Sequence, residues 1–416
     1  MTAPAGPQPR FPALDGIRAI AAFAVVATHV GFNSGRSGDN GPFAPLLARL
    51  DFGVTLFFLL SGFVIYRPFL VAALDGRQPP RTRRTRQFLI RRAVRILPAY
   101  WVTVLVTLAV LSLQQPTAHD WWAYPLLLQT YTGGNHISSL TQMWTLSVEL
   151  CFYLLIPLFA ARATPHTGEH TTGDRVVRRN LVLIGSLIAL AALAGMLAHL
   201  VPAVGTRSLV WLPANVDWFA LGMLLALISA CSSRTGAAAT HWQPRFFDTW
   251  RTLARATGLC WVFAGLLFWF ATLPVAGSRL LIVPSGWESF VKHSLYGLCA
   301  LLILAPLTLA PAGQLSAALS RRPVRYLGEI SYGVYLWHLP LLLAIQHRFG
   351  YAAFTGHFWL LLALTVLSSV LVASLSWRLL ERPLMRLVSR RYSPPARDRA
   401  PTADTATASS ASSTSP

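Results

Sequence analysis

Residues 14–30 read LDGIRAIAAFAVVATHV, a stretch whose length and apolar content are typical of a helix that crosses a lipid bilayer. Arg18 and His29 stand eleven residues apart in it, so on a helix they share one face at a separation of roughly 16 Å. Ionisable groups inside a membrane usually face a protein interior or a wet cavity. We therefore predict a polar path along this helix. The structural alternative places Arg18 at the membrane surface and bonds His29 to a neighbouring helix.

Apolar runs of similar length recur along the whole chain. The hydrophobic fraction is 54%, the charged fraction is 12% and the mean hydropathy is +0.49, against about 25% charged residues in ordinary soluble domains. The predicted spans are residues 12–32, 52–74, 98–113, 143–161, 180–201, 208–231, 257–275, 290–311, 329–346 and 357–380. Residues 121–131 are apolar but too short to cross. The predicted fold is all-α, an integral-membrane bundle of about ten transmembrane helices.

Arginine placement predicts the orientation of these helices. If both termini are cytoplasmic, the inner loops and tail hold 26 arginines and the outer loops hold five. Membrane proteins concentrate Arg and Lys on the cytoplasmic side, so we expect cytoplasmic N- and C-termini in a multi-pass protein of the inner (plasma) membrane. The net charge of +20 then reflects topology and anionic lipid, and no nucleic-acid partner is expected. The single lysine beside 34 arginines is typical of a high-GC bacterium.

The domain organisation predicted from composition is simple. Residues 1–11 form an N-terminal cytoplasmic segment without the layout of a cleavable signal peptide. Residues 12–385 form one membrane domain, and residues 386–416 form a cytoplasmic tail whose Pro, Ser, Thr and Ala content predicts disorder. The four cysteines show no metal-binding spacing, so we expect them to be packing residues and expect no metal site.

Two polar motifs occur where a purely structural bundle would avoid them. Ser61 lies in FFLLSGF, inside the second predicted span, where close helix packing is the structural alternative. Arg91, Arg92 and Arg95 form a basic face at the start of the third span. Planar guanidinium groups suit bidentate contacts to phosphate, which favours a site for an anionic cosubstrate. The positive-inside pattern alone would also explain these arginines.

Two further motifs place ionisable groups within predicted helices. The stretch MWTLSVELCFYLLIP carries Glu149 at a depth similar to that of His29, which suits a histidine base with an orienting carboxylate. The stretch GEISYGVYLWHLP carries Tyr332 and His338. His338 is explained equally well as a core histidine whose hydrogen bonds are satisfied. Glu381 is interpreted as a member of a structural ion pair with the arginines beside it in sequence.

Six motifs occur in one order along residues 12–385: LDGIRAIAAFAVVATHV, FFLLSGF, RRAVRILP, WTLSVELCFYLLIP, GEISYGVYLWH and the terminal ERP. This ordered set resembles the bacterial membrane-bound acyltransferase-3 family of the O-acetylase type. The resemblance implies a bundle of about ten helices that moves an acyl group, usually acetyl, from acyl-CoA (acetyl-CoA) as cosubstrate to a hydroxyl group, with no bound cofactor. Many members add an extracytoplasmic hydrolase-like domain. The sequence contains none, so we expect it to act alone or with a separate partner.

The resemblance also assigns roles to particular residues. Arg18 and His29 match the family's Arg-x10-His pair, which makes His29 the leading catalytic candidate, as base for the acceptor hydroxyl or as a transient acyl carrier. Glu149 falls on a Ser-Leu-x-x-Glu-like element and is expected to support His29. Arg92 and Arg95 match an Arg-x-x-Arg element and, with Arg18, are expected to hold the coenzyme. The candidate substrate-binding residues are Ser61, Trp144, Tyr332 and His338.

The acceptor and the class of function stay open on sequence alone. The breadth of the family favours a hydroxyl on an envelope carbohydrate or glycan. The missing extracytoplasmic domain and the composition favour a secondary metabolite such as a macrolide antibiotic. A transporter or flippase without chemistry is the alternative from another class, although the two halves of the chain show no repeat. An inactive sensor or scaffold is a third interpretation, against which the intact Arg18, His29 and Glu149 argue.

Overall fold

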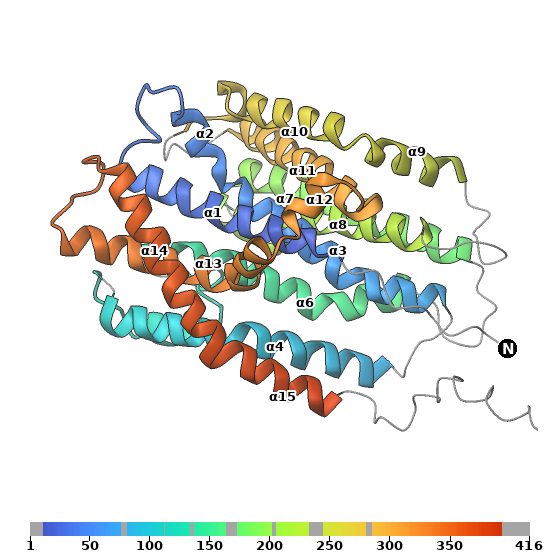
Figure 1. Ribbon diagram of the computed structural model, residues 1–416, viewed down its shortest axis with the longest axis horizontal. Helices are drawn as coiled ribbons and strands as arrows, with labels where there is room; N and C mark the ends of the chain where they lie inside the picture. The colour runs from blue at the N-terminus through green and yellow to red at the C-terminus, as the bar shows by residue number, and fades with distance from the viewer. Residues whose placement is uncertain are drawn as a thin grey trace, which may run out of the picture.

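The computed structural model is helical and has no β-strand among the residues that it describes, as the sequence predicted. These residues are 11–75, 81–111, 113–133, 137–163, 173–201, 205–232, 244–279 and 285–392. Nearly all of the predicted N-terminal segment 1–11, and most of the predicted tail 386–416, lie outside the described residues. The long helices run side by side along the long axis of the molecule (Figure 1).

The helices follow one another without any intervening sheet. Their bounds are α1 Ala13–Asn33, α2 Ala44–Arg49, η1 Leu50–Phe52, α3 Gly53–Leu74, α4 Arg81–Val106, η2 Thr107–Leu111, α5 Asp120–Ala123, η3 Ser138–Met143, α6 Trp144–Ala163, α7 Gly173–Leu200, η4 Thr206–Val210, α8 Leu212–Ser232, α9 Pro244–Arg255, α10 Thr257–Ala271, η5 Pro274–Ala276, α11 Gly286–Leu309, α12 Gln314–Leu319, α13 Arg322–Arg348, α14 Phe358–Ser376, η6 Trp377–Glu381 and α15 Arg382–Tyr392.

Eight helical segments of the described chain are long and apolar enough to cross a membrane. They are Ala13–Asn33, Ala44–Leu74, Thr85–Leu111, Ser138–Ala163, Gly173–Leu200, Thr206–Ser232, Gly286–Leu309 and Phe358–Arg391. The pair α9 and α10, bent by 84°, contains the predicted span 257–275 and would be a ninth. The predicted span 329–346 lies within α13, which has 27 residues and whose Tyr, His and Gln side chains make it more polar. The predicted membrane bundle is confirmed, and its orientation across the membrane stays a prediction.

Two predicted boundaries differ in detail from the structure. The short stretch 121–131 holds the end of α5 followed by turns, in keeping with a segment that does not cross. At the other end of the chain, α15 continues the helical fold to Tyr392, beyond the domain boundary predicted at residue 385. Its arginine-rich sequence still forms a helix because it packs against α4 and η6.

Close packing of α3 on α8 fixes the centre of the bundle. A Cβ atom at Gly62 would meet the backbone oxygen of Phe219, and one at Gly222 would meet that of Leu59, so only glycine allows the two backbones to approach this closely. The ring of Phe219 stacks on Phe58 with 4.6 Å between the ring centroids. The FFLLSGF motif is therefore partly a packing motif, and its glycine sets the position of the neighbouring serine.

Helices α1 and α13 run parallel and in contact along their length. A Cβ atom at Gly328 would meet the backbone oxygen of Asp15 near the start of α1. Near the other end, Gln346 donates a hydrogen bond to the backbone oxygen of Asn33 at 3.4 Å. The two contacts share almost the same offset in sequence, so the intervening turns of α1 and α13 are matched in depth.

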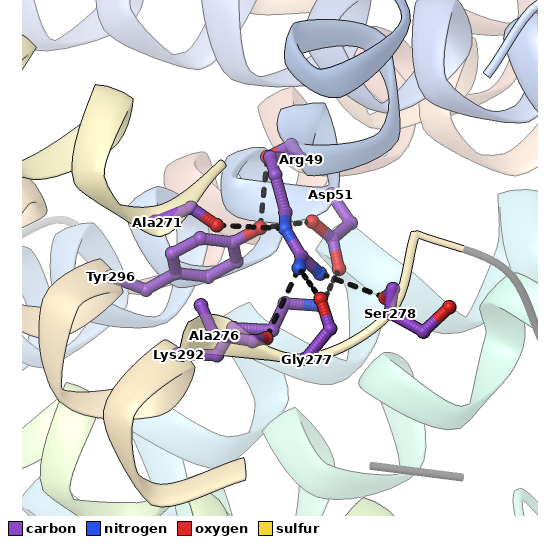
Figure 2. Close-up of polar contacts among 8 residues, drawn as sticks. All are labelled: Arg49, Asp51, Ala271, Ala276, Gly277, Ser278, Lys292 and Tyr296. Carbon is purple, nitrogen blue, oxygen red and sulfur yellow. Dashed lines mark hydrogen bonds and ion pairs between the residues drawn. The ribbon is translucent and has the colours of Figure 1, made fainter. Parts of the chain in front are cut away.

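A buried arginine joins α2 to the segment after α10 (Figure 2). The guanidinium group of Arg49, whose residue is 3% exposed, donates to four backbone oxygens. These belong to Ala271 at 2.9 Å, Ala276 at 3.1 Å, Gly277 at 2.5 Å and Ser278 at 3.5 Å. Buried polar groups require such partners. Arg49, which the sequence placed in an outer loop, therefore ties two ends of the bundle together.

Beside Arg49, a second polar group links η1 to α11 (Figure 2). The Nζ atom of Lys292 lies 2.7 Å from a carboxylate oxygen of Asp51. The hydroxyl group of Tyr296 lies 2.5 Å from the other oxygen of Asp51 and 3.0 Å from the backbone oxygen of Arg49. The start of α3 is thus held against α11 by charge and by hydrogen bonds.

Candidate active site

A cavity of about 610 Å³ lies among α1, α3, α4, α6 and α13. Six residues predicted from the sequence line it, which are Arg18, Ser61, Arg92, Arg95, Glu149 and Tyr332. The other three predicted residues, His29, Trp144 and His338, are not among the lining residues. Helices that are far apart in the sequence therefore bring together most of the predicted site, with the two histidines outside its wall.

One end of the cavity carries the arginines. Arg18 forms an ion pair with Asp15 at 2.7 Å, and Arg92 lies over the ring of Tyr153, with 5.5 Å between Cζ and the ring centroid. With the described residues, Arg91 and Arg92 form no ion pair, and both line the cavity. The positive charge gathered here fits a ligand that carries phosphate groups.

Arg95 is held more firmly than its neighbours. It lies 3.6 Å from Glu381, donates to the backbone oxygen of Glu329 at 3.3 Å, and stacks over the ring of Trp377 at 4.8 Å. The predicted structural ion pair of Glu381 thus exists, but its partner comes from α4 and is not one of the arginines beside it in sequence. Glu381 therefore anchors α4, and with it the basic face of the cavity, to the end of the α14 segment.

Further into the cavity, Glu149 accepts two hydrogen bonds on one carboxylate oxygen. Ser61 donates from α3 at 2.6 Å, and the hydroxyl group of Tyr153 donates from the next turn of α6. Both donors line the cavity together with Glu149. The sequence missed Tyr153, although residues four apart share a helix face and this spacing would have found it.

The cavity ends at Tyr335. This side chain is 6% exposed, and its hydroxyl group lies 2.8 Å from Oγ1 of Thr145 and donates to the backbone oxygen of Gln142 at 3.1 Å. Its ring also contacts those of Phe57 and His338, each with 5.7 Å between centroids. Tyr335 therefore stands between the cavity and the histidines.

Beyond Tyr335, the two predicted histidines contact each other. Nε2 of His338 lies 3.1 Å from Nδ1 of His29, as the matched depth of α1 and α13 requires. The same Nδ1 atom lies 3.0 Å from the backbone oxygen of Val25. His338 is fully buried, whereas His29 is only partly buried. Both alternatives raised for these residues apply, since each histidine is bonded to a neighbouring helix and both lie at the end of the cavity.

The expected contact between His29 and Glu149 is not formed. Each side chain has other partners, and no hydrogen bond or ion pair joins them in the described structure. Their similar depth in sequence did not reveal Tyr335, which lies beside His338 and lines the cavity with Glu149. Trp144 packs edge-on against Phe58 at 6.1 Å, outside the cavity wall.

Comparison with known proteins agrees with this architecture. The model of the acyltransferase domain family matches residues 11–378, which is nearly the whole described chain. The chain belongs to the acyltransferase-3 family. This acyltransferase-3 chain is 24% identical over 394 residues to the peptidoglycan O-acetyltransferase OatA of Listeria monocytogenes, and 26% identical over 414 residues to the putative peptidoglycan O-acetyltransferase YrhL of Bacillus subtilis.

These relatives are longer proteins than the acyltransferase-3 chain described above. The matches cover 90% and 92% of the chain but 56% of each relative. The O-acetyltransferase OatA of Staphylococcus aureus shows the same pattern, with 22% identity over 91% of the chain and 58% of the relative. The chain thus spans little more than half the length of the relatives that it matches. No solved structure matches it significantly.

Proposed function

We propose that the protein is an integral-membrane O-acyltransferase that moves an acetyl group from acetyl-CoA to a hydroxyl group of a cell-envelope glycan. One observation carries the proposal: a single cavity has arginines at one end and, at the other, a tyrosine in contact with a pair of histidines. Family membership supports acyl transfer. The names of the relatives, which are peptidoglycan O-acetyltransferases, support an acetyl donor and a glycan acceptor.

The donor enters by charge. The phosphate groups of acetyl-CoA meet Arg18, Arg91 and Arg92, since guanidinium groups bind phosphate in bidentate fashion. The neutral arm of the coenzyme then lies along the apolar part of the wall, which includes Val64 and Ile65. This arrangement brings the thioester toward Tyr335 and the histidine pair. Arg95, already engaged by Glu381, orients the basic face rather than supplying its freest charge.

The chemistry requires a base for the acceptor hydroxyl and a path for the acetyl group past Tyr335. His29 is the proposed base, because it is only partly buried and lies at the end of the cavity. Glu149, bonded to Ser61 and Tyr153, supports the donor side of the site and does not contact His29. Tyr332, whose hydroxyl group donates to the backbone oxygen of Ile96 at 2.9 Å, shapes the wall between them.

The test is thiol release from acetyl-CoA by the purified protein in lipid nanodiscs, with peptidoglycan fragments as acceptors. We expect release and acetylated fragments with the wild type and with His347→Ala, an exposed histidine on α13. We expect loss of both with His29→Ala. Absence of release with every acceptor would contradict the proposal and favour transport without chemistry. Acetylation of a macrolide but not of glycan fragments would keep the donor and replace the acceptor.

A further inference from the structure

The histidine pair is held by two backbone carbonyl groups. Nδ1 of His29 faces the backbone oxygen of Val25 at 3.0 Å, and Nδ1 of His338 faces that of Tyr335 at 2.7 Å. Between the rings, only one nitrogen of each takes part, Nδ1 of His29 and Nε2 of His338. No carboxylate of a described residue bonds to either ring. The positions of the protons therefore follow from these contacts.

A carbonyl oxygen only accepts, so each Nδ1 atom must carry its proton. A neutral imidazole carries one proton in all, which leaves Nε2 bare on both rings. The lone pair on Nε2 of His338 then accepts from Nδ1 of His29, whose proton is shared with the carbonyl of Val25. The opposite assignment would set a nitrogen lone pair against a carbonyl oxygen at 2.7 Å on His338 and at 3.0 Å on His29. Two repulsive contacts exclude it.

We propose that His338 is a positioning residue that fixes His29 with its Nε2 atom bare and directed away from the pair. The inference rests on the proposed function in one respect, which is that His29 acts as the base. Val25 alone would select the tautomer of His29. His338 adds the second acceptor that fixes the plane of the ring, from a helix matched in depth with α1.

The assignment accounts for every proton in the transfer. The acceptor hydroxyl gives its proton to Nε2 of His29 while its oxygen attacks the acyl carbon of the thioester. The carbon–sulfur bond breaks, and the leaving thiolate takes the proton from Nε2, which restores the neutral ring. In between, the imidazolium of His29 keeps its Nδ1 proton on two acceptors that are already in place. Charge that develops in the reaction is stabilised without rearrangement.

Proton positions can be measured without turnover. Nitrogen-15 NMR of histidine-labelled protein in nanodiscs separates a protonated ring nitrogen from a bare one, and His29→Gln and His338→Gln assign the signals. We expect a protonated Nδ1 and a bare Nε2 on both residues at neutral pH. A proton on Nε2 of either residue would overturn the inference. This outcome does not depend on whether the protein transfers acetyl groups, so it is separate from failure of the proposed function.

A matched pair of variants tests the role of His338. His338→Gln keeps a side-chain acceptor for His29, whereas His338→Leu has similar bulk and no acceptor. We expect the leucine variant to lower kcat by about 100-fold with little change in the KM for acetyl-CoA, and the glutamine variant to recover most of it, since outer partners of this kind contribute about 10- to 100-fold. Equal losses in both variants, or a loss expressed only in KM, would reduce His338 to a packing residue.

Discussion

Ser61 on α3 donates a hydrogen bond to Glu149 on α6 at 2.6 Å, across 88 residues of sequence. The contact fixes the face that α6 presents to the cavity, because Thr145 and Tyr153 lie one turn on either side of Glu149 and line the same wall. One face of α6 thus carries the carboxylate, its second donor and the latch of Tyr335. The predictions below start from this face.

Replacement of Glu149 should affect the reaction more than replacement of its partner. Glu149→Gln keeps an acceptor for Ser61 but removes the negative charge from the cavity, and we expect kcat to fall by roughly 100-fold, within the range of charged groups in reaction sites. Ser61→Ala removes one of two donors, and we expect a fall of roughly tenfold, since a hydrogen bond to a charged group is worth about 1.5–3 kcal/mol. Thiol release from acetyl-CoA measures both, and equal activity of Glu149→Gln and wild type would contradict the role.

Loss of a cavity arginine should weaken donor binding. Arg92→Gln removes a guanidinium group that forms no ion pair with the described residues, and we expect the KM for acetyl-CoA to rise by roughly tenfold or more with kcat little changed. Arg348→Gln, an exposed arginine at the end of α13, is the control and should behave as wild type. The same series with acetyl-dephospho-CoA should show a smaller difference. A KM unchanged by Arg92→Gln would remove this residue from the donor site.

Arg49 should contribute to stability and not to the chemistry. Arg49→Leu leaves several buried backbone oxygens without their donor, and we expect a loss of about 3 kcal/mol in the free energy of unfolding. Arg36 is the control, because its ion pair with Asp39 is exposed and such pairs are worth about 0–1 kcal/mol. Thermal unfolding in detergent should show a clearly lower Tm for Arg49→Leu than for Arg36→Gln. Similar Tm values would contradict the anchoring role.

Gly62 should not tolerate even a methyl group. The Cβ atom of Gly62→Ala would meet the backbone of Phe219, so α3 and α8 must separate, at a cost of about 1–3 kcal/mol typical of overpacking. Gly265→Ala on α10 is the matched control, since its Cβ would meet nothing within 4 Å. Thermal stability should fall for the first variant and hold or rise for the second. Separation of α3 from α8 should also move Ser61, so the activity of Gly62→Ala should fall with its stability.

The sequence predicted the helices well because hydropathy acts along the chain. A span of apolar residues announces itself, whatever its neighbours are. Arg18, Ser61 and Glu149 were found for the same reason, since polar side chains within such spans stand out. The bend of 84° between α9 and α10 has no comparable signal, because it depends on how the rest of the bundle packs.

Contacts between helices could not be predicted in this way. Depth in the membrane suggested Glu149 as a partner of His29, but depth does not say which helices are neighbours. The parallel packing of α1 on α13 decides that His338 is the partner. Similarly, Glu381 pairs with Arg95 from a distant helix and not with an arginine beside it in sequence.

Tyr335 has a consequence for the membrane itself. A polar cavity lined by arginines inside a bilayer is a potential leak for protons and small ions. The ring of Tyr335, held by Thr145 and Gln142, closes that cavity before it reaches the histidine pair. In the resting protein one aromatic side chain therefore acts as electrical insulation. If the acetyl group passes this point, each turnover opens and recloses the seal, and the membrane potential is preserved because the opening lasts no longer than one transfer.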